Sequence, residues 1–152
     1  MDPVKLLMKQ HREVEALFKK IEQTEKANER KELMGQIKQK LELHTTIEED
    51  IFYPAIRELD TDKAEEMVLE AYEEHHVVKL VLAELPNVDP EDERFEAKMT
   101  VLKELVEHHV EEEEQDKGGL FKLAKKLGKE HLEELGDRMA AEAGSPQGRR
   151  AA

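Results

Sequence analysis

The sequence predicts an all-α protein, an up-down-up-down four-helix bundle with a short fifth helix at the C-terminal end. Alanine, leucine, glutamate and lysine are abundant in the 152 residues, and all four favour helix. Apolar residues recur every three or four positions in four long segments, which is the spacing of one helix face. The joins between these segments are short, so consecutive helices should lie antiparallel.

The first two segments carry start and stop signals. Asp2-Pro3 suits a helix start, because aspartate can cap a helix and proline fits its first position. A polar stretch at residues 26–29 precedes the second segment, which should kink near its end because Pro54 crowds the carbonyl of Asp50. The two apolar stripes are Val4, Leu7, His11, Val14, Phe18 and Ile21, and then Leu33, Ile37, Leu41, His44, Ile47, Ile51 and Ala55.

The third segment begins after a break at residues 60–62. Asp62 with Glu65 resembles a capping box, in which two side chains satisfy the first free N–H groups of a helix. Pro86 should close the segment, since proline cannot continue a helix. Its apolar stripe is Val68, Ala71, His75, Val78, Leu82 and Leu85.

The fourth segment opens at Asp89-Pro90, with the same signal as the first, and ends at Gly118-Gly119. A fifth, shorter helix is expected at residues 120–141. These elements predict one domain over residues 1–142 and a disordered tail over residues 143–152. The fourth stripe is Met99, Leu102, Leu105, Val106, His109 and Glu113, and the fifth helix should pack through Leu123, Leu127, Leu132 and Leu135.

Composition excludes several classes of protein. The net charge of −13 would repel a nucleic-acid backbone, so we expect no nucleic-acid partner. The absence of cysteine excludes disulfides, iron–sulfur clusters and thiolate chemistry, and it is compatible with a reducing compartment. No apolar stretch reaches the ~18 residues of a membrane span, and no signal-peptide segment is evident. We therefore expect a soluble, cytoplasmic protein with no membrane partner.

Each of the four long segments carries one histidine in register with its apolar stripe. A single buried histidine is usually a core residue with its hydrogen bonds satisfied. Four that face one axis need either a dense hydrogen-bond network or a metal, because an imidazole buried without a partner is costly. The four are His11, His44, His75 and His109.

Two carboxylates strengthen the metal hypothesis. Glu48 follows His44 by four residues and Glu113 follows His109 by four, so each pair lies on one helix face. One such pair is common in an acidic helical chain, whereas two pairs beside apolar stripes on different helices indicate a site. Imidazole with carboxylate suits iron, and also manganese or zinc. Two bridging carboxylates with terminal histidines suit two metals better than one.

Two histidine doublets leave the register open. Adjacent helical residues point about 100° apart, so only one member of each doublet can face the axis. His75 continues its apolar stripe, while His76 lies on the flank. His109 continues the fourth stripe, and His108 with Glu112 is the competing register. We choose His75 and His109 and keep the other members as alternatives.

These motifs resemble those of the hemerythrin family, in its bacterial HHE cation-binding branch. The matching segments are KQHREVEALF, LELHTTIEEDIFYPAI, EEHHVVKLVLAEL and EHHVEEEEQDKGG, and the resemblance extends over about residues 4–140. It implies a hemerythrin-like bundle around a non-haem centre of two iron ions. It also implies a role for each candidate ligand: Glu48 and Glu113 as bridges, His11 and His44 on one iron, and His75 and His109 on the other.

The chain departs from the oxygen-carrying hemerythrins at two positions. Those proteins have a further histidine one turn before the third-helix ligand, where this chain has Ala71. They also have an aspartate at the position of Glu114. The resemblance therefore implies one iron with a missing protein ligand, which argues against reversible oxygen carriage. The candidates to replace that ligand are water, Tyr72, Glu74 and His76.

Three classes of function remain. The preferred one is a metal-binding protein that binds iron and O2 or a related small molecule, peroxide or nitric oxide, for sensing, storage or stress protection. The alternative is a di-iron enzyme that reduces peroxide or nitric oxide, with electrons from a protein partner. The third is an acidic bundle whose histidines are structural. Steady peroxide turnover would favour the second class, and failure to retain metal would favour the third.

Overall fold

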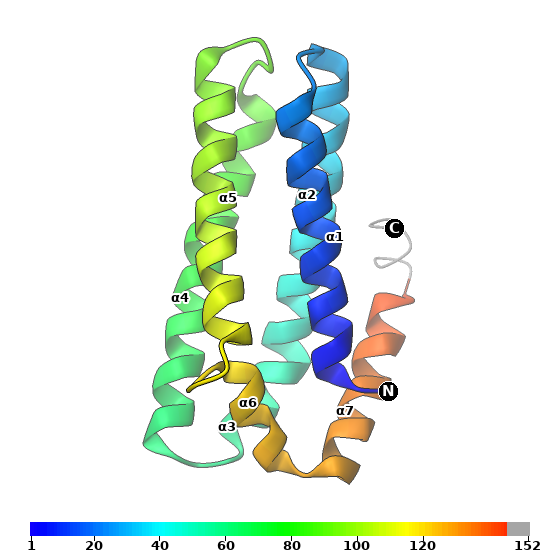
Figure 1. Ribbon diagram of the computed structural model, residues 1–152, viewed down its shortest axis with the longest axis vertical. Coiled ribbons are helices and arrows are strands. Elements are labelled where there is room, and N and C mark those ends of the chain that lie inside the picture. The colour runs from blue at the N-terminus through cyan, green and yellow to red at the C-terminus, as the bar shows by residue number, and fades with distance from the viewer. Residues whose placement is uncertain (146–152) are drawn as a thin grey trace.

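The computed structural model describes residues 1–145, and these are mostly helical. Helices α1 (Pro3–Gln23), α2 (Ala27–Ile47), α4 (Asp62–Glu84) and α5 (Glu93–Glu114) run alternately up and down the bundle (Figure 1). This arrangement confirms the predicted all-α, up-down-up-down fold. Within residues 1–145, no helix combines the length and the apolar character that crossing a membrane requires.

The helix starts agree with the predicted capping in one case and differ in two. Asp2 caps α1 as predicted, because its carboxylate accepts a hydrogen bond from Val4 N at 2.9 Å. The α4 cap is Thr61 rather than Asp62, since the Thr61 hydroxyl accepts the bond from Ala64 N.

The α5 helix begins three residues later than the Asp89-Pro90 signal predicts. Asp89 caps a separate turn, in which its carboxylate accepts from Glu91 N at 2.9 Å. Asp92 then provides the α5 cap by accepting from Arg94 N. Either aspartate could cap a helix, and the turn at Asp89 leaves that role to Asp92.

A π-helical turn, Glu48–Phe52, follows α2 and leads into α3 (Tyr53–Arg57). Here the Tyr53 N–H donates to the Glu48 carbonyl, five residues back. Pro54 has no N–H and its ring crowds the carbonyl four residues before it, so a wider turn ahead of it relieves the conflict. The irregularity predicted at Pro54 thus takes the form of a π turn.

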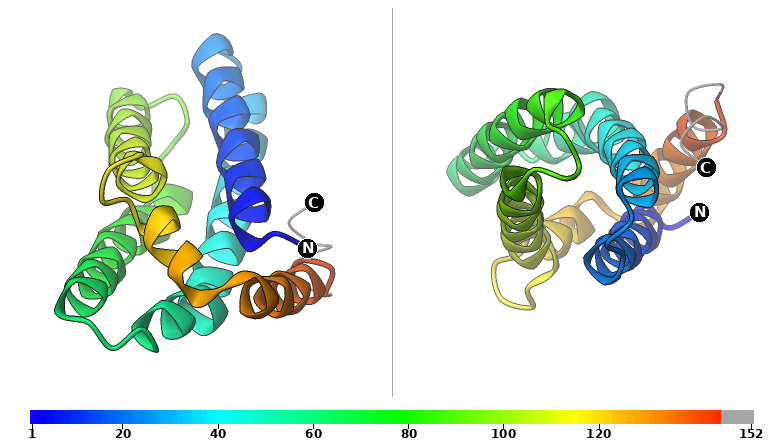
Figure 2. Two further views of the ribbon diagram at one scale, coloured as in Figure 1. Left: turned by 60° about the horizontal axis from the view of Figure 1, so that its bottom comes forward. Right: turned by 90° about the horizontal axis from the view of Figure 1, so that it is seen from above.

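The C-terminal part forms two helices instead of the single helix predicted at residues 120–141. Helix α6 (Leu120–Ala124) and a 3-10 turn (Lys125–Leu127) end at Gly128. The φ of 91° at Gly128 lies in the left-handed region that favours glycine, so the helical path breaks there. Helix α7 (Lys129–Ala143) then takes a different direction (Figure 2).

Helix α7 packs against the start of α1. Gly136 lies so close to the Met1 carbonyl that a Cβ at this position would overlap it. The N-terminal ammonium also pairs with Asp137 at 3.1 Å. The predicted tail at residues 143–152 lies, from residue 146 onward, outside the described residues.

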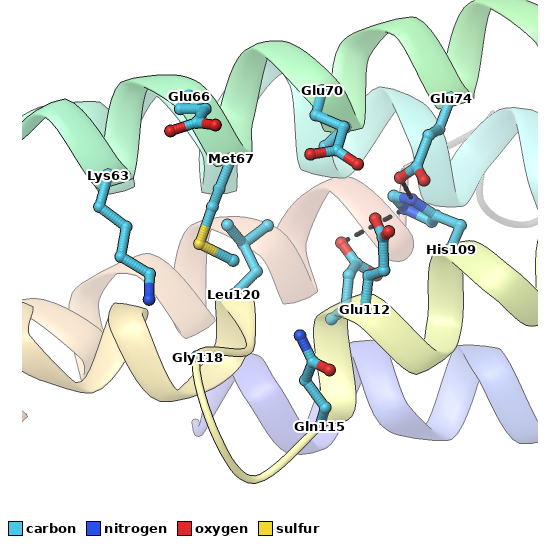
Figure 3. A pocket seen from close by; sticks show the side chains of 12 residues that line it. Lys63, Glu66, Met67, Glu70, Glu74, His109, Glu112, Gln115, Gly118 and Leu120 are labelled. Carbon is cyan, nitrogen blue, oxygen red and sulfur yellow. Dashed lines mark hydrogen bonds and ion pairs between the residues drawn. The ribbon is translucent and has the colours of Figure 1, made fainter.

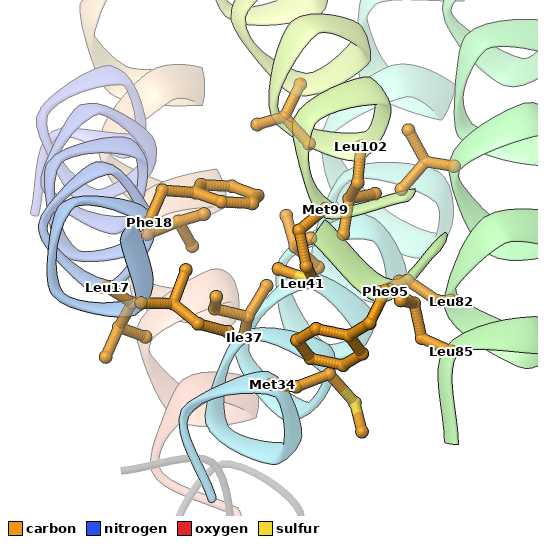
Figure 4. Close-up of a cluster of buried hydrophobic side chains, with 14 of the residues drawn as sticks. Leu17, Phe18, Met34, Ile37, Leu41, Leu82, Leu85, Phe95, Met99 and Leu102 are labelled. Atoms are coloured by element: carbon orange, nitrogen blue, oxygen red, sulfur yellow. The ribbon is translucent and has the colours of Figure 1, made fainter. Parts of the chain in front are cut away.

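Two apolar clusters make up the core. The first fills the end of the bundle that holds the α1–α2 and α4–α5 connections (Figure 4). The second fills the opposite end, where α6 and α7 pack. Along α1, Leu7 belongs to the second cluster and Val14 to the first, and His11 lies between them. The bundle therefore carries a polar layer between two apolar ones.

Candidate metal centre

The four histidines predicted from the apolar stripes meet inside the bundle. Each comes from a different long helix and all are buried, whereas His76 and His108 are exposed. The apolar stripes of α4 and α5 predicted which histidine of each doublet would face inward, and the burial of His75 and His109 agrees with them. The four buried residues are His11 on α1, His44 on α2, His75 on α4 and His109 on α5.

The buried histidines form two close pairs. His11 Nε2 lies 3.2 Å from His44 Nε2. In the second pair, His75 Nε2 lies 3.1 Å from His109 Nε2. Two neutral imidazoles that direct lone pairs at each other repel. Each pair therefore needs a proton or a metal cation at its Nε2 atoms.

Glu48, on the π turn after α2, contacts both pairs. Its Oε1 lies 3.0 Å from His44 Nε2 and 3.1 Å from His75 Nε2. The residue is 0% exposed, and its other oxygen, Oε2, receives no hydrogen bond from the described residues. A buried carboxylate thus joins the two pairs and keeps an oxygen without a donor.

Glu113, one turn after His109 on α5, also contacts both pairs. Its Oε1 lies 3.2 Å from His11 Nε2, and its Oε2 lies 3.4 Å from His109 Nε2. The residue is 1% exposed, and within residues 1–145 its Oε1 receives no hydrogen bond. A buried acceptor without a donor costs free energy. The free oxygens of Glu48 and Glu113 therefore fit a site built for cations.

The outward nitrogen of each buried histidine makes a hydrogen bond to a side-chain oxygen. An Nδ1–H that donates to oxygen leaves the Nε2 lone pair free, which is the arrangement typical of metal-bound histidines. The bonds are His11 Nδ1 to Glu114 (2.7 Å), His44 Nδ1 to Gln10 (2.6 Å), His75 Nδ1 to Glu49 (3.0 Å) and His109 Nδ1 to Glu74 (2.7 Å).

Tyr53 adds a donor atom that the sequence interpretation missed. The side chain is fully buried, and its hydroxyl donates to Glu113 Oε2 at 2.7 Å. The Tyr53 hydroxyl oxygen also lies 3.2 Å from both His75 Nε2 and His109 Nε2. The phenol therefore lies at the pair for which the family resemblance implies a missing ligand. The signal in the sequence was Pro54, whose effect on the preceding turn carries Tyr53 to this face.

The three side chains that were candidates for that position, beside water, lie elsewhere. The Tyr72 hydroxyl donates to the Glu49 carbonyl at 3.2 Å. Glu74 accepts the hydrogen bond from His109 Nδ1, on the outer side of that ring. His76 is exposed.

Burial and charge shift the pKa values of the polar layer in opposite directions. Burial alone would lower the pKa of His109, but the charge and hydrogen bond of Glu113 outweigh it and raise that pKa well above 6.5. The pKa of His11 is also raised, because the negative charge of the adjacent Glu113 outweighs the effect of burial. Burial would raise the pKa of Glu48, whereas the His44 charge and several hydrogen bonds hold it well below 4.5. Without a cation, the layer therefore favours the protonated forms of His11 and His109 and the charged form of Glu48.

The two sides of the polar layer differ in access. On the side of the first apolar cluster, the histidines adjoin a cavity of only about 20 Å3 that valine and leucine side chains also line. On another side, a cavity of about 460 Å3 between α4 and α5 reaches His109 and Glu113 (Figure 3). Phe121 of α6 stacks on His11, with ring centroids 5.7 Å apart and planes 11° apart. Solvent therefore approaches through the wider cavity.

The donor atoms fall into two sets that suit transition metals. Each set combines imidazole nitrogen with carboxylate oxygen, which iron, manganese and zinc all accept. Within each set the donor atoms lie within 4.8 Å of one another, and Glu48 belongs to both. The sets are His11, His44, Glu48 and Glu113, and then Glu48, His75 and His109.

Comparisons with known proteins give a family match, a similar solved structure and one sequence relative. The family model of the hemerythrin HHE cation binding domain matches residues 2–121. A crystal structure of a hemerythrin HHE cation binding domain-containing protein from Mycobacterium kansasii superposes with a TM-score of 0.82, at 27% identity, over 98% of this chain and 89% of that chain. A DNA nickase from Nostoc sp. is 29% identical over 104 residues, which are 68% of this chain and 29% of the nickase. The chain thus spans less than a third of that relative.

Proposed function

The chain belongs to the hemerythrin HHE cation-binding domain family, and on that premise we propose that it is a non-haem di-iron protein. It binds O2 or a related small molecule, peroxide or nitric oxide, at the iron. The biological use is sensing, storage or protection against oxidative or nitrosative stress. The finding that the family binds cations supports the metal, and the arrangement of donor atoms supports two ions rather than one.

The observation that carries the proposal is the orientation of the four buried imidazoles. Every Nδ1 has an oxygen partner on the outer side, and every Nε2 points to the space shared with Glu48 and Glu113. A hydrogen-bond network alone would leave two buried carboxylate oxygens without donors. Two cations would satisfy these oxygens and remove the repulsion within each histidine pair.

We assign the ligands of each iron from the contacts among the buried side chains. One histidine pair would hold each iron, both glutamates would contact both irons, and the phenol oxygen of Tyr53 would be a further ligand of the second iron. Bound iron supplies a Lewis acid and a redox centre. The protein holds the imidazoles in one tautomer and excludes water on the apolar side. The assignment is His11 and His44 on the first iron, His75, His109 and Tyr53 on the second, and Glu48 and Glu113 as bridges.

A small ligand would reach the second iron through the wider cavity. Ala71 lies in the wall of this cavity together with His109 and Glu113. A methyl side chain leaves room where the oxygen-carrying relatives place a histidine. The first iron is more enclosed, because Phe121 stacks on His11. We therefore expect O2, peroxide or nitric oxide to attach at the second iron.

We expect about two irons per chain in protein purified without chelators. Zinc in a protein site takes only three or four ligands, fewer than the six side chains predicted here plus Tyr53. Elemental analysis of iron, zinc and manganese measures the stoichiometry, and protein stripped by a chelator is the control. One zinc per chain, with no iron uptake by the stripped protein, would contradict the di-iron assignment.

Tyr53→Phe should weaken binding of the second iron by about 10- to 100-fold, because it removes a donor atom at that ion while the ring still packs. A visible absorption band from phenolate bound to iron(III) should also disappear. The measurement is equilibrium iron binding together with the optical spectrum.

Tyr72→Phe is the matched control for Tyr53→Phe. It removes the same atom from a tyrosine whose hydroxyl bonds the Glu49 carbonyl, away from the histidine pairs. Its iron content and spectrum should match those of the wild type. Equal effects of the two variants would remove Tyr53 from the ligand set.

The second candidate function is enzymatic reduction of peroxide or nitric oxide, favoured by the open cavity at His109 and Glu113. The chain has no cysteine, so the electrons would come from a partner protein. Sustained peroxide consumption in the presence of a reductant would favour this function over binding alone. DNA nicking is not proposed for this chain, because its net charge of −13 repels the phosphate backbone.

A further inference from the structure

A second group of metal-ligating side chains lies outside the buried polar layer. His108 Nε2 is 3.0 Å from Glu112 Oε1 and 3.4 Å from Glu74 Oε2. The donor atoms of these three residues lie within 4.8 Å of one another, a separation that one divalent cation can span. The side chain of His108 is 64% exposed, so a cation from solvent can reach the group directly.

Glu74 connects this outer group to the buried centre. Its Oε2 faces His108, while its Oε1 accepts the hydrogen bond from His109 Nδ1 at 2.7 Å. One carboxylate thus contacts an exposed histidine on one side and a proposed iron ligand on the other. The outer group and the centre are therefore immediate neighbours.

Like charges are stacked along the cavity between α4 and α5. Glu66, Glu70 and Glu74 follow one another at four-residue intervals on α4. Figure 3 shows them in a row along one wall, with Glu112 of α5 facing them. Like charges at this spacing destabilise a helix, so the row has a cost in a chain without cations. Together these carboxylates concentrate cations in the cavity.

The inner end of the same cavity is formed by residues of the buried centre. Glu113 lies in the cavity wall, is 1% exposed, and has the buried Oε1 that receives no hydrogen bond from the described residues. His109 lies in the wall beside it. Glu74 and Glu112 of the outer group line the same cavity, which therefore connects them with the buried carboxylate of Glu113.

We propose that Glu74, His108 and Glu112 form an outer divalent-cation site that receives iron(II) from solvent and passes it through the acidic cavity to the buried centre. The transfer exchanges ligands only and involves no change in oxidation state. This inference rests on the proposed di-iron function, since the buried centre is the destination. It gives His108 a role in loading, although His108 is no ligand of the filled centre.

The first test is the rate of iron uptake by the metal-free, full-length protein. Iron(II) is added without oxygen, and the filled centre is counted as iron that survives a short exposure to a chelator. Glu112→Gln should slow uptake about tenfold, because it removes one outer ligand and one charge of the cavity. Glu70→Gln should slow it less, and final iron content should stay at about two per chain in both.

Glu111→Gln is the matched control, because Glu111 is the exposed neighbour of Glu112 on α5 and lies outside the cavity wall. Its uptake rate should stay close to that of the wild type. Equal rates for Glu111→Gln and Glu112→Gln would overturn the inference and leave the di-iron function intact. A wild-type protein that never retains iron would overturn both.

The second test is occupancy of the outer site after the centre has been filled with iron. Manganese(II) is titrated in, and free manganese is measured by electron paramagnetic resonance. The wild type should bind one further ion, and the double variant His108→Ala, Glu112→Gln should bind it about 100-fold more weakly. No further ion in the wild type, or equal binding in the double variant, would overturn the outer site.

Discussion

Replacing His75 or His109 by alanine is expected to empty the second iron position, with affinity reduced by at least about 100-fold. The change removes a donor nitrogen and leaves its partner, Glu48 or Glu113, facing a gap in the layer. Changes to the outer partners of such ligands already cost about 10- to 100-fold in metal affinity. Iron content and equilibrium iron binding measure the loss.

The neighbouring histidines provide the controls. His76→Ala and His108→Ala remove the same group one residue away, about 100° around the helix, from side chains that are exposed. Both variants should reach two irons per chain when equilibrated, although His108→Ala should load more slowly. A His76→Ala protein without metal, beside a His75→Ala protein that retains it, would show that the register assigned to α4 is wrong.

Removal of the metal is expected to lower the melting temperature by about 10 °C. A ligand at 1,000 times its dissociation constant stabilises the native state by about 4 kcal/mol, and each kcal/mol shifts melting by about 2–4 °C in a chain of this size. The metal-free protein also keeps charged groups in a buried layer. Thermal unfolding before and after chelation measures the difference, and an unchanged melting curve would argue against a buried site.

The difference in melting temperature should grow as pH rises from about 5.5 to about 8. The raised pKa of His109 stabilises the metal-free fold below 6.5, and this contribution is lost as pH rises through the folded pKa. The lowered pKa of Glu48 stabilises it above 4.5, and this contribution is lost as pH falls through the folded pKa. The metal-free fold is therefore most stable between about pH 4.5 and pH 6.5, where both contributions are present. Metal binding displaces the imidazole protons and strengthens with pH. A difference that shrinks with rising pH would contradict this assignment of protons.

The apolar stripes were enough to predict which histidines would be buried. His75 continues a stripe and is 1% exposed, while its neighbour His76 is exposed. The period of an α-helix relates each position to one face, so a regular helix needs no tertiary information for this prediction. The same reasoning placed Glu48 and Glu113 one turn after a histidine, where the structure buries both.

Tyr53 could not be predicted by that reasoning. In a regular α-helix, Tyr53 would point about 140° away from Glu48, because five residues turn the chain by about 500°. The π turn at Glu48–Phe52 changes this rotation and directs the phenol to the buried layer. Single-residue signals have a similar weakness, since Asp89 and Asp92 both suit a helix cap and only Asp92 provides it.

The sequence by itself determined the helical class, the antiparallel order of the long helices, and the face on which each predicted site residue lies. Tertiary structure decided which residues meet across helices: the pairing of His11 with His44 and of His75 with His109, and the acidic cavity that ends at Glu113. The physical reason is that periodicity is a property of one helix, whereas contacts between helices depend on their relative rotation and axial shift. Those are set by the packing of whole faces, which no local spacing records.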